Sequence, residues 1–252
     1  VLFGALMFQV KTKNNMNNII KRRRRFLGGV GSYANAYSIQ FDGTNDYFDP
    51  GSTFQATFRN SFTIGFWMNT NTRPTSGEHY LFGGWEFASP YSRIYMTLNS
   101  SGTLAFLMEA EGSGTLNANT STGVIGASGS GGWMHVAIVV TKAGGSNNTT
   151  AKIFINGSEN TNTSSSGMTG TEQETYDADG KKIFFGQLSS GGSINAFFVG
   201  YGGKMDEIAI WSAALSDASV AVVGAEPFNL KAANGNYTNQ SDLVSHWRFI
   251  EG

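Results

Sequence analysis

Apolar and polar residues alternate with a period of two along most of this chain, and that period is typical of β-strands rather than helices. The alternation is clearest in FTIGFWMNT, residues 62–70, where every second side chain is apolar. The apolar positions are Phe62, Ile64, Phe66 and Met68. We therefore predict a strand over this segment with one wholly apolar face turned towards a core.

The same pattern predicts several further strands. They are WMHVAIVVTK (133–142), AKIFINGSEN (151–160), KKIFFGQL (181–188) and GKMDEIAIW (203–211). The segment RIYMTLNSSGTLAFLMEAEG predicts a hairpin that turns at Asn99–Gly102. Asn156 and Gly157 predict a type I′ turn, because both central residues of that turn need a positive φ.

One segment has a helical pattern. SDASVAVVGAE, residues 216–226, offers Ser216 as an N-cap and Asp217 in the first turn. Two other segments, 112–132 and 160–171, are rich in glycine, serine and threonine. We expect both to be long exposed loops, because they are too polar to enter a core.

Composition supports a single all-β unit with appendages. The chain has 252 residues, a length that β-sandwiches commonly reach as one domain. Its 33 glycines and 4 prolines suit many short strands joined by polar turns. The chain has no cysteine, which excludes disulfides and cysteine-based zinc sites and leaves the cellular compartment open.

Charge is distributed unevenly along the chain. Seven of the 17 basic residues lie in the first 41 positions, which contain no acid. They are Lys11, Lys13, Lys21, Arg22, Arg23, Arg24 and Arg25. The remainder carries 10 basic and 18 acidic residues, so only this N-terminal arm could bind nucleic acid. The apolar run VLFGALMF is far shorter than the roughly 20 residues that span a bilayer, and a signal-peptide pattern starting at Met16 is weak, so we expect no membrane span.

Five segments together carry a family resemblance. In chain order they are SIQFDGTNDYFD, FTIGFWMNT, WMHVAIVV, KIFINGS and GKMDEIAIWSAALSDASV. They resemble the laminin-G-like, concanavalin A-like jelly-roll domains. The resemblance implies an all-β, antiparallel β-sandwich jelly roll over residues 37–224, between an N-terminal basic arm (1–36) and a C-terminal extension (225–252). The tail NGNYTNQSDLVSHWRFIEG resembles the segment that follows such domains in marine virus proteins.

Catalytic patterns are weak. Glu109 and Glu111 share a strand face, but the further acids that accompany such a pair in glycosidases of this fold are missing, so we expect both to be solvent-side residues. The chain has no G-x-S-x-G motif, and His79, His135 and His246 are scattered. We expect His135 on the polar side of its strand and predict that the protein is not an enzyme.

Three aspartates are candidate calcium ligands. Asp42 and Asp46 flank a glycine turn, and carboxylates beside turn carbonyls are the ligands that Ca²⁺ prefers. The resemblance implies that Asp206, at the start of the last long strand, shares a structural calcium ion with Asp42. The alternative is that Asp42 and Asp46 accept backbone N–H bonds within a turn while Asp206 pairs with a cation.

Two functions fit these observations. In the first, the chain is a structural or decoration protein on the surface of a virus particle, and Lys21 and Arg22–Arg25 anchor it to capsid or tail subunits or to nucleic acid. In the second, it is a secreted or surface carbohydrate-binding module. Trp85, Tyr80 and Tyr91 are then the candidate ligand-binding residues, because sugar rings stack on aromatic faces. The cationic arm favours the first function.

Overall fold

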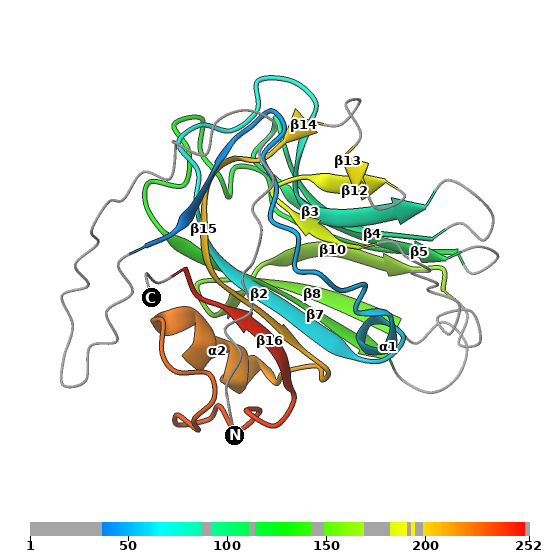
Figure 1. The fold of residues 1–252 in the computed structure, drawn as a ribbon, viewed down its shortest axis with the longest axis vertical. Helices are drawn as coiled ribbons and strands as arrows, with labels where there is room; N and C mark the ends of the chain where they lie inside the picture. The colour runs from blue at the N-terminus through cyan, green and yellow to red at the C-terminus, as the bar shows by residue number, and fades with distance from the viewer. Residues whose placement is uncertain are drawn as a thin grey trace.

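A computed structural model shows the fold of this protein and describes residues 37–86, 92–110, 114–142, 149–168, 182–190, 193–194 and 199–249. Two β-sheets stack face to face, so the prediction of an all-β sandwich is confirmed (Figure 1). The N-terminal arm, with Lys21 and Arg22–Arg25, lies outside the described residues.

One sheet has seven strands in the described part of the chain, and all its pairings are antiparallel. The order is β1-β15-β2-β7-β8-β9, and β16 also pairs with β15. The strands are β1 (Ile39–Asp42), β2 (Phe62–Asn69), β7 (Met134–Lys142), β8 (Thr149–Ile155), β9 (Ser158–Glu159), β15 (Gly202–Trp211) and β16 (Leu243–Trp247).

The described residues of the other sheet form nine strands in the order β10-β6-β5-β4-β3-β12-β13, and β11 and β14 also pair with β3. The longer strands are β3 (Glu78–Glu86), β4 (Ser92–Asn99), β5 (Leu104–Ala110), β6 (Gly114–Thr120) and β10 (Thr161–Ser166). The short ones are β11 (Phe184–Phe185), β12 (Leu188–Ser190), β13 (Ser193–Ile194) and β14 (Val199–Gly200). Because β12 and β14 run parallel to β3, this sheet is mixed.

The main core lies between the two sheets. The predicted apolar face of β2 is confirmed, since its four side chains are fully buried in this core. Both predicted turns are also confirmed. Gly102 N–H donates to Asn99 O, and Asn156 and Gly157 have φ values of 49° and 79°, as a type I′ turn requires.

A second apolar cluster covers the outer face of the seven-stranded sheet. Helix α2 (Asp217–Ala225) packs Val220 and Val223 against this face, and the Ser216 side chain caps the helix by accepting the Ser219 N–H, as predicted. Trp211 Nε1–H donates to Tyr237 Oη, 3.0 Å away. Among the described residues, neither α2 nor α1 (Gln55–Phe58) is long and apolar enough to cross a bilayer.

This cover explains why the expectation for His135 was wrong. The side chain does lie on the face of β7 opposite the main core, but it is only 1% exposed. The described part of the segment assigned to a C-terminal extension, residues 225–249, supplies that cover and more. It adds β16 to the sheet and places Trp247 in the main core, so it is an integral part of the sandwich.

The two predicted long loops contain strands, so those predictions were wrong. β6 lies within residues 112–132, and β10 lies within 160–171. Their side chains are mostly polar, and β10 is largely exposed at the sheet edge. Both strands form because they pair through their backbones, with Ser164 opposite Ala118 and Ser165 opposite Asn117.

Candidate functional site

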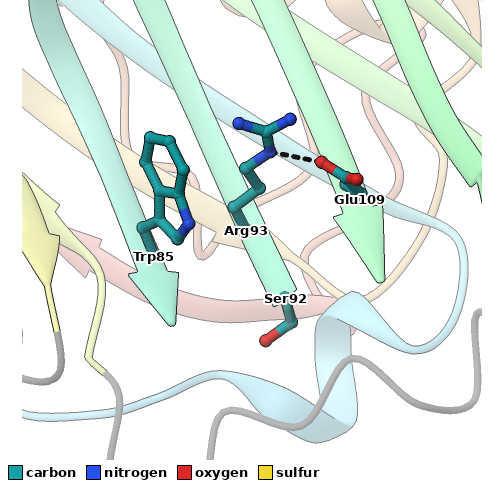
Figure 2. Close-up of a pocket in the computed structure, with 4 residues that line it drawn as sticks. All are labelled: Trp85, Ser92, Arg93 and Glu109. Carbon is teal, nitrogen blue, oxygen red and sulfur yellow. Dashed lines mark hydrogen bonds and ion pairs between the residues drawn. The ribbon is translucent and has the colours of Figure 1, made fainter. Parts of the chain in front are cut away.

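The outer face of the nine-stranded sheet carries a row formed by one aromatic and two charged side chains. The antiparallel registers place Arg93 of β4 directly between Trp85 of β3 and Glu109 of β5. Together with Ser92, these residues line a pocket of about 200 Å³ (Figure 2). Directly opposed residues on one face lie about 5 Å apart, so the row is a contiguous surface.

A β-bulge in β3 selects which residues reach this face. Tyr80 pairs with Thr97, but Phe82 pairs with Met96, so Leu81 is the extra residue. Both Leu81 and Phe82 point into the main core. Because the bulge shifts the alternation by one, Tyr80 and Trp85 lie on the same outer face although five positions separate them.

Aromatic rings form a second part of the site. The rings of Trp85 and Tyr95 stack with centroids 6.3 Å apart and an interplanar angle of 26°, and the Tyr80 ring meets Tyr95 edge-on at 5.4 Å. Tyr95 is half-buried, and Tyr80 is 8% exposed. Tyr95 and Arg93 were not among the predicted site residues, although their i, i+2 spacing in RIYM places both on one strand face.

Arg93 joins the aromatic and acidic parts of the pocket. Its Nε–H donates to Glu109 Oε2 in an ion pair, and its guanidinium carbon lies 4.7 Å from the centroid of the Trp85 ring. The two charged side chains are 26% and 32% exposed, so both remain accessible from solvent. The arrangement offers N–H donors, a carboxylate acceptor and an apolar ring within one small area.

Both tyrosine hydroxyls of the site stay protonated at neutral pH. Burial raises the pKa of Tyr95, Arg93 opposes this rise, and the negative charges of Glu78 and Glu109 add to it. Burial is also the main cause that raises the pKa of Tyr80, followed by Tyr95 and Glu78. The hydroxyls are therefore neutral groups that can donate as well as accept hydrogen bonds.

The structure brings together part of the predicted ligand-binding set. Trp85 lines the pocket, whereas Tyr80 is not among the residues that line it and packs edge-on against Tyr95. Tyr91 lies outside the described residues. Glu109 is on the solvent side of β5, as expected, and pairs with Arg93, whereas Glu111 lies outside the described residues.

Asp42 and Asp46 act within a turn. Asp42 Oδ1 accepts the N–H groups of Thr44 and Asn45 at 2.7 and 3.3 Å, and Asp46 Oδ2 accepts the Asp42 N–H at 3.0 Å. Burial raises the pKa of Asp46, and the nearby negative charge of Asp42 adds to the rise. These contacts are those of the turn-capping alternative.

Asp206 is not brought to this turn. Asp42 pairs with Gly202 of β15, and Asp206 follows four residues further along that strand, which corresponds to roughly 13 Å. Asp206 Oδ1 accepts the Glu207 N–H at 2.7 Å. No group of three or more His, Asp or Glu residues in the described ranges could hold a metal ion.

A buried charged cluster on β15 and β16 was also missed. Glu207 has a φ of 49° at a bulge in β15, and its Oε2 lies 2.6 Å from His246 Nε2. Arg248 Nε donates to Glu207 Oε1 at 3.2 Å. The sequence separates Glu207 from these partners by about 40 positions, so only the pairing of the two strands could reveal the cluster.

Solved structures share this fold at low sequence identity. The CBM40 module of the Ruminococcus gnavus IT-sialidase is 13% identical, with a TM-score of 0.54 over 75% of this chain and 97% of its own. The same module bound to α2,3 sialyllactose gives 14% and 0.52 over 74% and 96%. The leech intramolecular trans-sialidase, complexed with 2,7-anhydro-Neu5Ac, also gives 14% and 0.52; the match covers 76% of this chain but 27% of that enzyme.

Sequence comparison assigns the family. No curated protein sequence matches the chain. A family model described as the concanavalin A-like lectin/glucanases superfamily matches residues 42–221, a range that runs from the last residue of β1 into α2 and contains the strands from β2 to β15. This chain therefore belongs to the concanavalin A-like lectin/glucanases superfamily.

Proposed function

We propose that this protein is a non-catalytic glycan-binding module whose ligand lies over Trp85 on the outer face of the nine-stranded sheet. The observation that carries the proposal is the pocket in which the Trp85 ring adjoins Arg93 and Glu109. Sugars present apolar C–H faces and rings of hydroxyls, so their sites combine an aromatic surface with a few polar groups that fix orientation.

The ion pair of Glu109 supports binding rather than hydrolysis. A retaining glycosidase holds two carboxyl groups about 5 Å apart, so that one protonates the leaving group and the other attacks the sugar. Glu109 is instead engaged by the guanidinium of Arg93. The CBM40 module with the same fold, solved bound to sialyllactose, is consistent with a binding role for this architecture.

The experiment is a glycan array probed with the full chain and two tryptophan variants. Trp85→Ala should reduce glycan retention at least tenfold, because it removes the stacking surface. Trp133→Ala is the matched control, since Trp133 is also half-buried but does not line the pocket. If Trp85→Ala and wild type retain the same glycans equally, the site is wrong; if wild type retains none, the function is wrong.

The virion interpretation remains a second candidate that rests on the sequence of the N-terminal arm. Its support is the concentration of seven basic residues in the first 41 positions. An arm of this kind would bind an acidic shell or nucleic acid, and salt would weaken that binding. Deleting residues 1–36 should then abolish incorporation into the assembly, and unchanged incorporation would contradict the interpretation.

A further inference from the structure

The pocket over Trp85 contains a cation whose charge is already matched. Arg93 donates through Nε to Glu109, and the two residues lie opposite each other on neighbouring strands. Their pairing is therefore fixed by the register of the sheet. A sugar carboxylate that approached Arg93 would meet the Glu109 carboxylate at the same guanidinium and would have to displace it or accept its repulsion.

The charges around the site add to this bias. Three charged side chains act on the Tyr95 hydroxyl, and two of them, Glu78 and Glu109, are anions against the single cation Arg93. An anionic ligand would therefore enter a region without a surplus of positive charge.

The hydrogen-bond donors and acceptors of the site suit a different ligand. Arg93 supplies N–H donors, Glu109 supplies carboxylate acceptors, and Ser92 lines the same pocket. Two adjacent sugar hydroxyls can bind the pair together: one accepts a hydrogen bond from the Arg93 guanidinium, and the other donates a hydrogen bond to the Glu109 carboxylate. The ion pair between Arg93 and Glu109 then stays intact. The Trp85 ring provides the apolar surface for the sugar face.

We infer that this pocket takes neutral glycans and discriminates against acidic ones such as sialylated or uronic-acid sugars. The inference rests on the proposed glycan-binding function and names the ligand class of that same site. It separates this chain from the CBM40 module of similar fold, which was solved with sialyllactose bound. The Arg93–Glu109 pair is the residue-level cause of the discrimination.

The test measures the full chain against pairs of related glycans, of which one member is neutral and the other acidic. Lactose against 3′-sialyllactose is one pair, and glucose oligomers against glucuronic-acid oligomers form another, both read by an array and by titration calorimetry. The neutral member of each bound pair should bind at least tenfold more tightly. Its affinity should change less than twofold between 50 and 300 mM salt, since binding forms no new net ion pair.

The variant Glu109→Gln releases Arg93 from its partner while it keeps the size of the side chain. We expect the preference within each pair to shift towards the acidic member by at least tenfold, and this binding to weaken as salt rises. Arg93→Gln is the matched control, because it removes the cation and should not produce that shift. A melting curve for each variant verifies that it is folded, and the wild-type pairs decide the question if one is not.

The outcomes separate the two proposals. Tighter wild-type binding of the acidic members, dependent on Trp85, would overturn the discrimination and leave the glycan-binding function intact. Equal affinity within the pairs, or no shift in a folded Glu109→Gln variant, would also overturn it. Binding of no member of any pair, on the array or in solution, would overturn the proposed function and the inference together.

Discussion

The carboxylate of Glu207 and the imidazole of His246 lie 2.6 Å apart across the neighbouring strands β15 and β16, and both side chains are only 5% exposed. Arg248 contacts the other oxygen of the same carboxylate. This cluster ties the last described strand to the longest strand of the sandwich. Groups buried to this degree depend on their partners, because an ion left alone in such a place is costly.

We predict that Glu207→Gln lowers the free energy of unfolding by about 3 kcal/mol, since it removes the buried carboxylate that His246 and Arg248 share. Urea denaturation at pH 7 measures the change. The control is Glu159→Gln, which removes the exposed partner of Lys152 at 3.0 Å and should cost less than about 1 kcal/mol. Equal decreases in the free energy of unfolding for the two variants would show that the buried cluster contributes no more stability than the exposed ion pair.

A second prediction concerns acid and His135. Burial lowers the pKa of His135 to about 3, whereas an unfolded histidine titrates near about 6.5. Between these values the unfolded chain binds the extra proton. Its contribution therefore lowers the free energy of unfolding by about 1.4 kcal/mol for each pH unit as the pH falls through this window.

The variant His135→Leu should lose this component of the pH dependence. Denaturation at pH 7, 6, 5 and 4 gives the free energy of unfolding as a function of pH. The slope of this curve should be smaller for the variant than for wild type by the equivalent of one bound proton, because the carboxylates titrate alike in both proteins. The substitution itself is tolerable, since Nδ1 of His135 is buried and has no hydrogen-bond partner. Parallel curves for the two proteins would contradict the assignment of a buried neutral histidine.

A third prediction concerns calcium. The separation of Asp206 from Asp42 leads us to expect that a chelator leaves the melting midpoint unchanged within about 1 °C, because an ion raises stability only when it binds the folded state. Thermal melts with EDTA and with millimolar calcium measure this. A midpoint that falls in EDTA and recovers with calcium would show that the chain holds the ion by another set of ligands.

A fourth prediction concerns Gly83, which lies opposite Tyr95 on the neighbouring strand of the candidate site. A Cβ at this position would lie 2.6 Å from both Leu188 Cδ1 and Tyr95 Cβ. Gly83→Ala should therefore cost about 2 kcal/mol and displace the Tyr95 ring from Trp85. Gly126→Ala is the control, since its Cβ would meet nothing closer than 3.5 Å. Thermal melts and near-ultraviolet circular dichroism report the two effects, and equal behaviour of the variants would contradict the prediction.

The sequence predicted those elements in which alternate side chains are buried or in which a turn needs particular residues. β2 and the Asn156–Gly157 turn follow from alternating burial and from φ requirements. The edge strand β10 could not be predicted in this way, because its polar side chains are largely exposed and its pairing is a property of the backbone. A short polar strand such as β10 has the same length and polarity as a loop, so the sequence does not distinguish them.

The candidate site was predicted only in part for a related reason. Trp85 was identified as a candidate aromatic surface for sugar rings, but the bulge at Leu81 decides which neighbours share its face. A one-residue bulge leaves no distinct mark on an apolar segment such as YLFGGW. The partnership of Arg93 with Glu109 depends on the register between β4 and β5, which the hairpin turn at Asn99–Gly102 sets.

Helix α2 and the segment after it cover the outer face of the seven-stranded sheet, so the two outer faces of the sandwich differ. On the β3–β5 side the candidate site keeps the side chains of Arg93 and Glu109 partly exposed, and its pocket is small and open to solvent. Small, open sites release their ligands quickly, so a module with such a site binds more tightly when several copies act together. Under the proposed function, two or more copies displayed on one support would bind a glycan-coated surface 10²- to 10⁴-fold more tightly than one copy, without any new contact.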